Sequence, residues 1–92
     1  MLVDKDLLNK ILTTLAEEYP GTMSLDAFNR VCEGQEDIRK VAGHFQYLME
    51  QGYIDTEVLV DYDYTPRTYQ VNIYKTRIYS SGIDFLSEGG YK

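Results

Sequence analysis

Phe45-Gln-Tyr-Leu-Met-Glu-Gln-Gly-Tyr-Ile54 is the stretch of the chain that decides the fold. Its apolar residues keep helical spacing as far as Met49, and Gly52 stands where a residue in the left-handed conformation often ends a helix. From Ile54 onward the apolar period changes to two, which is the period of a half-buried strand. We therefore expect a helix that passes directly into a strand.

Three helices are expected in the first half of the chain. The first begins after Asp4 or Asp6, either of which can cap it, and ends before Tyr19-Pro20-Gly21. Ser24 is a good cap for the second helix, and the third spans about residues 35–51. The apolar faces expected to enter the core are Leu7, Leu8, Ile11, Leu12 and Leu15 in the first helix, Leu25, Phe28 and Val31 in the second, and Ile38, Val41, Ala42, Phe45, Leu48 and Met49 in the third.

A Tyr-rich antiparallel hairpin is expected after the third helix, with its turn at Thr65-Pro66-Arg67. Alternate residues of its first strand share one face: Ile54, Thr56, Val58, Val60, Tyr62 and Tyr64. Around that turn, the favourable cross-strand pairs are Tyr62 with Tyr69, Val60 with Val71, and Val58 with Ile73.

The second strand of this hairpin poses a problem of register near its end. Continued without interruption, the pairing buries Lys75 and Arg77 and exposes Ile78. We therefore expect a one-residue bulge near Tyr74-Lys75, which buries Ile78 and sets the two cations near Glu57 and Asp55. Beyond it, Ser80 or Ser81 can cap a short final helix, and the tail over residues 89–92 is expected to fray.

The order of these elements resembles the winged helix-turn-helix superfamily over roughly residues 4–88. The ending is similar to the Leu-Thr-x-x-Gly-x-x-Phe/Tyr-Leu pattern of small bacterial and phage winged-helix proteins, with Tyr79 and Ser80 in place of the usual Thr. The residues that carry the resemblance are Phe45, Leu48, Met49, Gly52, Tyr53 and Ile54, followed by Ile78, Gly82, Phe85 and Leu86. The resemblance implies one α+β domain over residues 1–92: a three-helix bundle, a two- to three-stranded antiparallel wing and a short C-terminal helix.

The usual task of that superfamily is DNA binding, with the third helix offered to the duplex and the wing beside it. A dimeric DNA-binding transcriptional regulator is therefore one hypothesis, with contacts from Arg39, Lys40, Gln46 and Tyr47 and from Arg67 on the wing. The charge argues against it, because the chain carries −6 at neutral pH and a pI of about 4.6. Duplex binders gain much of their affinity by placing Lys and Arg against phosphates.

Tyrosines and acidic residues gather on the wing and lead to a different expectation. There are 9 Tyr and no Trp in the chain, and three of these tyrosines, Tyr62, Tyr64 and Tyr69, belong to the far end of the hairpin. They can cap the apolar face of the sheet, or they can anchor a protein interface with Asp61 and Asp63 as its charged rim. We favour a regulatory or adaptor module that binds a protein partner or itself. An acidic mimic of DNA is a third hypothesis, which rests on charge alone.

Chemistry of other kinds has little support in the sequence. His44 is the only His and Cys32 the only Cys, whereas a structural zinc site needs about four such ligands. No constellation of a nucleophile, an orienting group and an oxyanion site is present, and no Gly-rich phosphate loop. We expect neither catalysis nor a metal or cofactor. The N-terminus lacks a signal-peptide pattern and no apolar run approaches the ~20 residues of a membrane span, so a cytoplasmic protein is expected.

Overall fold

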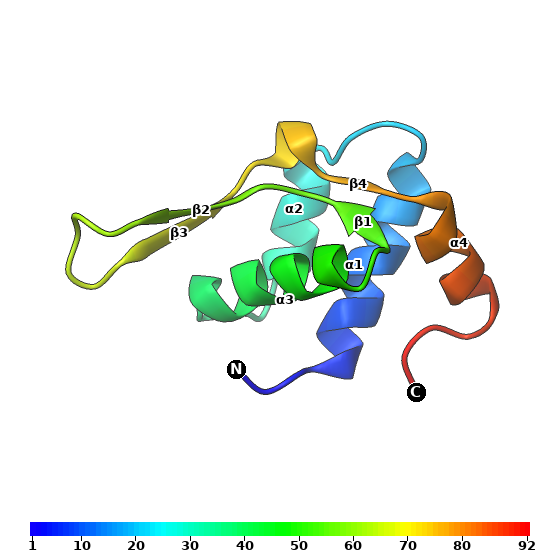
Figure 1. The fold of residues 1–92 in the computed structure, drawn as a ribbon, viewed down its shortest axis with the longest axis horizontal. Helices are drawn as coiled ribbons and strands as arrows, with labels where there is room; N and C mark the ends of the chain where they lie inside the picture. The colour runs from blue at the N-terminus through cyan, green and yellow to red at the C-terminus, as the bar shows by residue number, and fades with distance from the viewer.

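A computed structural model describes all residues 1–92 and contains four helices and two small antiparallel sheets of an α+β domain (Figure 1). The helices are α1 (Lys5–Glu18), α2 (Leu25–Cys32), α3 (Ile38–Glu50) and α4 (Ser80–Ser87). The strands are β1 (Ile54–Asp55), β2 (Val58–Asp61), β3 (Thr68–Val71) and β4 (Arg77–Ile78), with a 3₁₀ turn, η1 (Ile73–Lys75), before β4. None of the helices has the length and apolarity required to cross a bilayer.

The first three helices begin at short polar residues whose side chains accept a free backbone N–H of the first turn. Asp4 accepts from the N–H of Leu7 at 3.1 Å, which confirms the expected cap of α1. Ser24 caps α2 in the same way, and Asp37 caps α3. The expected serine cap of α4 is wrong, because the hydroxyl of Ser81 donates instead to the carbonyl oxygen of Gly52 at 2.7 Å.

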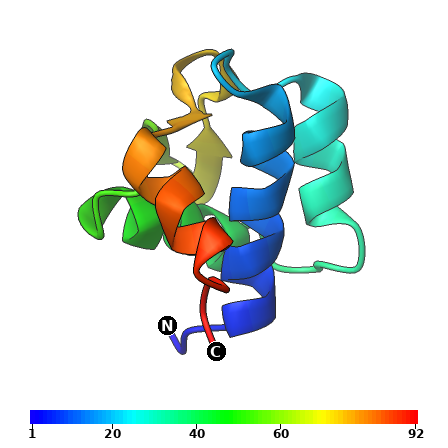
Figure 2. The ribbon, with the colours of Figure 1, turned by 90° about the vertical axis from the view of Figure 1, so that its right-hand side faces the viewer.

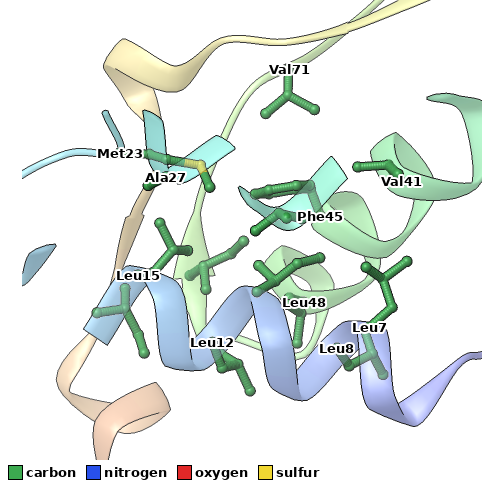
Figure 3. Close-up of a cluster of buried hydrophobic side chains, with 14 of the residues drawn as sticks. Leu7, Leu8, Leu12, Leu15, Met23, Ala27, Val41, Phe45, Leu48 and Val71 are labelled. Carbon is green, nitrogen blue, oxygen red and sulfur yellow. The ribbon is translucent and has the colours of Figure 1, made fainter. Parts of the chain in front are cut away.

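The core lies where α1, α2 and α3 meet the strands, and it contains 15 buried apolar residues (Figure 3). All five apolar residues expected to face inward from α1 are buried, and Phe45 of α3 is fully covered. Two expected core residues are on the surface: Leu25 is 63% exposed and Ile38 is 42% exposed. Each is the first residue of its helix. In α2, Ala27 is buried instead of Leu25.

The hairpin of β2 and β3 forms with a register that differs from the expected one by two residues. Val58 pairs with Val71, and Val60 pairs with Tyr69. The loop is centred one residue earlier than expected, because the ladder closes with the pair of Asp61 and Thr68 and leaves residues 62–67 as the loop. A shift of two residues preserves the side-chain alternation, so the assignment of residues to faces is correct.

The expected bulge is replaced by the 3₁₀ turn η1. The Asn72 side chain accepts the N–H of Tyr74 at 3.2 Å, a local bond that starts this turn. The expected consequences are nevertheless found. Ile78 is buried opposite Ile54, Arg77 pairs with Asp55 across the strands, and Lys75 Nζ lies 3.2 Å from Glu57 Oε2.

Buried threonines join the hairpin to the rest of the sheet structure. Thr76 donates its hydroxyl to the carbonyl of Asn72 at 2.8 Å, so Thr56 is the donor in the 2.8 Å bond between the two threonine hydroxyls. The carbonyl of Thr76 accepts the N–H of Met23 at 2.8 Å. This last bond ties the segment before α2 to the chain that enters β4.

The C-terminal tail packs against the domain, so the expectation that residues 89–92 fray is wrong (Figure 2). Gly89 and Gly90 have φ values of 109° and 67°, a conformation that favours glycine and redirects the chain toward α1. Asn9 of α1 then exchanges two hydrogen bonds, both of 2.9 Å, with the backbone of Tyr91. The ring of Tyr91 lies 4.7 Å from that of Phe85.

Candidate functional site

The β2–β3 hairpin and its loop, residues 58–71, form an arm that projects away from the helices (Figure 1). The arm gives the molecule its elongated shape, with principal extents of 41, 26 and 23 Å. At its root, Val71 is buried in the core, and Val58 is half-buried. The loop from 62 to 67 is fully on the surface, so the arm is anchored at one end only.

The structure divides the three tyrosines expected to act together. Tyr62 and Tyr64 lie on the loop and are 69% and 61% exposed. Tyr69 is half-buried nearer the root, where the guanidinium of Arg39 lies 5.9 Å from its ring centroid. The guanidinium of Arg67 lies 4.8 Å from the ring centroid of Tyr62. The tip therefore presents two exposed tyrosines rather than three.

Asp61 and Asp63 accompany these tyrosines as expected. Asp61 Oδ1 accepts the N–H of Asp63 at 3.0 Å, which shapes the start of the loop. Both residues are exposed, and neither takes part in any of the four ion pairs of the structure. The tip thus carries carboxylates that have no intramolecular cation bonded to them.

A groove of about 910 Å³ opens between the apolar face of the arm, the outer side of α3 and the first residues of the chain. We call it the arm groove. The arm contributes Val58, Val60 and Tyr69, and the opposite walls contain Arg39 and Lys40 of α3. The remaining lining residues come from the N-terminal segment and α3: Met1, Leu2, Val3, Asp4, Asp37, Ala42, Gly43 and Gln46.

The N-terminal segment is held against α3 by a set of polar contacts. The N–H of Asp4 donates to His44 Nε2 at 2.9 Å, and Asp4 Oδ2 lies 3.0 Å from Lys40 Nζ. The Lys40 bond, together with the N–H of Leu7, lowers the pKa of the Asp4 carboxyl. Met1 lies across Gly43, where an added Cβ would come within 2.5 Å of the Met1 sulfur.

His44 and Cys32 both pack within the domain. His44 is fully buried, and because Nε2 accepts from Asp4, Nδ1 donates to the carbonyl of Lys40 at 2.7 Å. Both ring nitrogens are therefore occupied. Burial raises the pKa of the half-buried Cys32 thiol, which disfavours the thiolate that nucleophilic chemistry requires.

The residues proposed for DNA contact are mostly engaged within the chain. Lys40 is paired with Asp4, and Gln46 donates to Glu50 Oε2 at 2.9 Å. Tyr47 belongs to an aromatic cluster that includes Tyr91, with ring centroids 6.4 Å apart. Burial raises the pKa of the Tyr91 hydroxyl to about 12.

Sequence reasoning missed the N-terminal wall of the arm groove. The one local signal for it is Gly43, because glycine inside a helix costs about 1 kcal/mol relative to alanine and calls for a reason such as a close approach. The chain matches no family model, no curated protein and no solved structure.

Proposed function

We propose that this chain is a winged-helix domain without catalytic activity, which acts as a regulatory or adaptor module by binding protein through its arm. Support for the fold comes from the order of three helices, a hairpin and a closing helix. The bond from Met23 to Thr76 stands where a winged helix has its first short strand, and β1 pairs with β4 beside it. The arm takes the position of the wing.

The observation that carries the protein-binding proposal is the exposure of Tyr62 and Tyr64 at the end of a projecting hairpin. Tyrosine is enriched at energetic centres of interfaces because it offers a large apolar ring with a hydrogen-bonding hydroxyl. Asp61 and Asp63 beside them add free negative charge, which steers and orients a partner that presents positive charge at the matching place.

Electrostatics favours protein over duplex as the partner of this surface. A wing that follows a phosphate backbone needs cations at its tip, and this tip has Asp61 and Asp63 against Arg67. On α3, the ion pair between Lys40 and Asp4 would have to break before Lys40 could bind a phosphate. The exposed tyrosines also distinguish the tip from an acidic mimic of DNA, for which carboxylates alone would suffice.

The test places a photo-crosslinking amino acid at position 64, in the cells that naturally produce the protein. The matched control places it at Asn29, an exposed residue of α2 away from the arm. We expect crosslinks to protein from position 64 and not from position 29, and their loss when Tyr62 is changed to Ser. Equal crosslinking from both positions would contradict the proposal.

A duplex titration complements this experiment. Fluorescence anisotropy with random-sequence DNA is measured at low and at higher salt, and we expect no appreciable binding. Affinity that falls steeply with salt, and is lost in the Arg39→Ala/Lys40→Ala variant, would overturn the proposal in favour of DNA binding.

A further inference from the structure

The arm tip and the arm groove of this chain have complementary chemistry. We propose that the arm groove takes the arm of a second copy of the chain, so that two copies exchange arms in a symmetric dimer. This inference rests on the proposed function, since it assumes that the arm is a binding surface. It adds the partner, the receiving site and the way in which the two strands pair.

The apolar parts of the two surfaces match. The arm groove has exposed apolar residues on its N-terminal wall, with Met1 68%, Leu2 91% and Val3 44% exposed. The tip offers Tyr62 and Tyr64. Burying the exposed parts of four tyrosines, two from each copy, removes about 400–650 Å² from water, and the groove walls lose a similar area. The upper part of the resulting total, about 800–1,300 Å², exceeds the roughly 1,000 Å² expected of a specific interface.

The free edge of β2 gives the second copy a way to pair. The N–H of Asn72 donates to the carbonyl of Glu57 at 2.9 Å, so by antiparallel alternation Leu59 and Asp61 direct their backbone groups toward β3. Val58 and Val60 then direct theirs away from β3, at an edge of the arm groove that has no strand beside it.

Two such edges pair antiparallel about a twofold axis when Val60 of one copy faces Val60 of the other. Tyr62 of the second copy then lies opposite Val58, on the face that lines the arm groove. On the other face of the sheet, Asp61 lies opposite Leu59, so no two carboxylates face each other within the paired residues 58–62. Asp63 lies beyond them in the loop, and it would stand opposite Glu57 only if the ladder continued past Tyr62. The interface is isologous, and both arms reach the root of the other in one closed dimer.

Charge selects a second copy over an unrelated apolar peptide. Arg39 stands at the wall of the arm groove without a carboxylate ion pair, and Asp63 at the tip has no cation. Asp37 lies on the same wall, and Arg67 at the tip of the second copy is the positive charge that pairs with it. Each local charge therefore meets its opposite when the arm of one copy enters the groove of the other.

Sedimentation velocity over a series of concentrations tests the inference. The proportions of monomer and dimer at each concentration give the Kd of the dimer. The wild-type chain is expected to form dimers, and the Tyr62→Ser/Tyr64→Ser variant to weaken them by about a hundredfold in Kd, as for two truncated interface anchors. The matched control is Leu25→Ser/Tyr74→Ser, which removes two exposed apolar residues outside the arm groove and should leave Kd unchanged.

A charge exchange provides the specific test of the receiving site. Asp63→Arg and Arg39→Asp should each weaken the homodimer by about tenfold, because each places like charges together at both ends of the interface. Mixing the two variants should restore dimers of wild-type affinity, since both contacts are then between opposite charges. Mixing that restores nothing would overturn the arm-exchange arrangement.

Failure of the inference is distinguishable from failure of the proposed function. A strictly monomeric wild-type chain that still crosslinks to another protein from position 64 overturns the second copy and leaves the arm as a protein-binding surface. A monomer that gives no such crosslink overturns both.

Discussion

Gly82 is the position where one added methyl group tests whether α4 lies close to the backbone that leads into β1. It lies in α4, against the segment that leads into β1. A Cβ at position 82 would stand 2.5 Å from the carbonyl oxygen of Tyr53 and 2.7 Å from Cγ1 of Ile78. The carbonyl cannot move without shifting β1, and Ile78 is fully buried.

The expected cost of Gly82→Ala is the difference of two terms. Alanine in place of glycine inside a helix contributes about 1 kcal/mol of stability. Forcing an extra carbon into a packed site costs about 1–3 kcal/mol, and the contact with a backbone atom favours the upper end of that range. Gly82→Ala should therefore lower the free energy of unfolding by about 1–2 kcal/mol.

Gly43→Ala is the matched control, because its added Cβ meets an atom at the same distance of 2.5 Å. That atom is the sulfur of Met1, at the end of a flexible side chain that is 68% exposed and can move aside. The helix term of about 1 kcal/mol then dominates, and Gly43→Ala should raise the free energy of unfolding.

Urea denaturation followed by circular dichroism measures both variants against the wild type. We expect midpoints on opposite sides of the wild-type midpoint, and a difference between the variants of about 2–3 kcal/mol. Thermal unfolding should then separate them by roughly 8–24 °C for a domain of this size. A Gly82→Ala variant as stable as the wild type would refute the close approach of α4 to β1.

Three further predictions concern buried polar groups and pH. Thr76→Val should lower the free energy of unfolding by about 1–3 kcal/mol, because it leaves the buried hydroxyl of Thr56 without an acceptor. Thr56→Val should cost less in the same urea titration, because the hydroxyl of Thr76 keeps its hydrogen bond to the carbonyl of Asn72. Tyr91→Phe should raise the thermal midpoint, since the Tyr91 hydroxyl is buried without a hydrogen-bond partner; a lower midpoint would show that the hydroxyl stabilises the tail. The folded chain should lose stability on acidification, because hydrogen bonds from Lys40 and Leu7 lower the pKa of Asp4 and those from Asn72 and Lys75 lower the pKa of Glu57. Both carboxylates stabilise the fold above their unfolded pKa, and this contribution disappears as the pH falls through the folded pKa, so the thermal midpoint of Asp4→Asn should depend less on pH than that of the wild type.

The features that followed from the sequence are those that depend on near neighbours in the chain. Asp4 and Ser24 could be identified as caps because capping joins residues three positions apart. The buried face of α1 follows from its apolar period, and Gly52 ends α3 with a φ of 81° as expected. The two faces of the hairpin follow in the same way from alternation.

The features that sequence reasoning missed depend on contacts between distant residues or on loop geometry. The hairpin register depends on where the loop of residues 62–67 begins, and Thr65-Pro66 alone does not set that position. The tail packs because Tyr91 meets Asn9, which lies 82 residues earlier. At the candidate site, the place of Tyr62 at the far end of the hairpin was expected, but the pairing of Lys40 with Asp4 joins residues 36 apart and has no local signal.

The central claim is that the arm is the surface through which this chain binds protein, and that its first partner is a second copy. A dilution series of ¹H–¹⁵N correlation spectra of the wild-type chain tests this claim residue by residue. Amide shifts should change with concentration over residues 58–71 of the arm and 37–46 of the arm groove, and remain constant over α2 and α4. Spectra that do not change on dilution, or changes that map to another surface, would contradict the account.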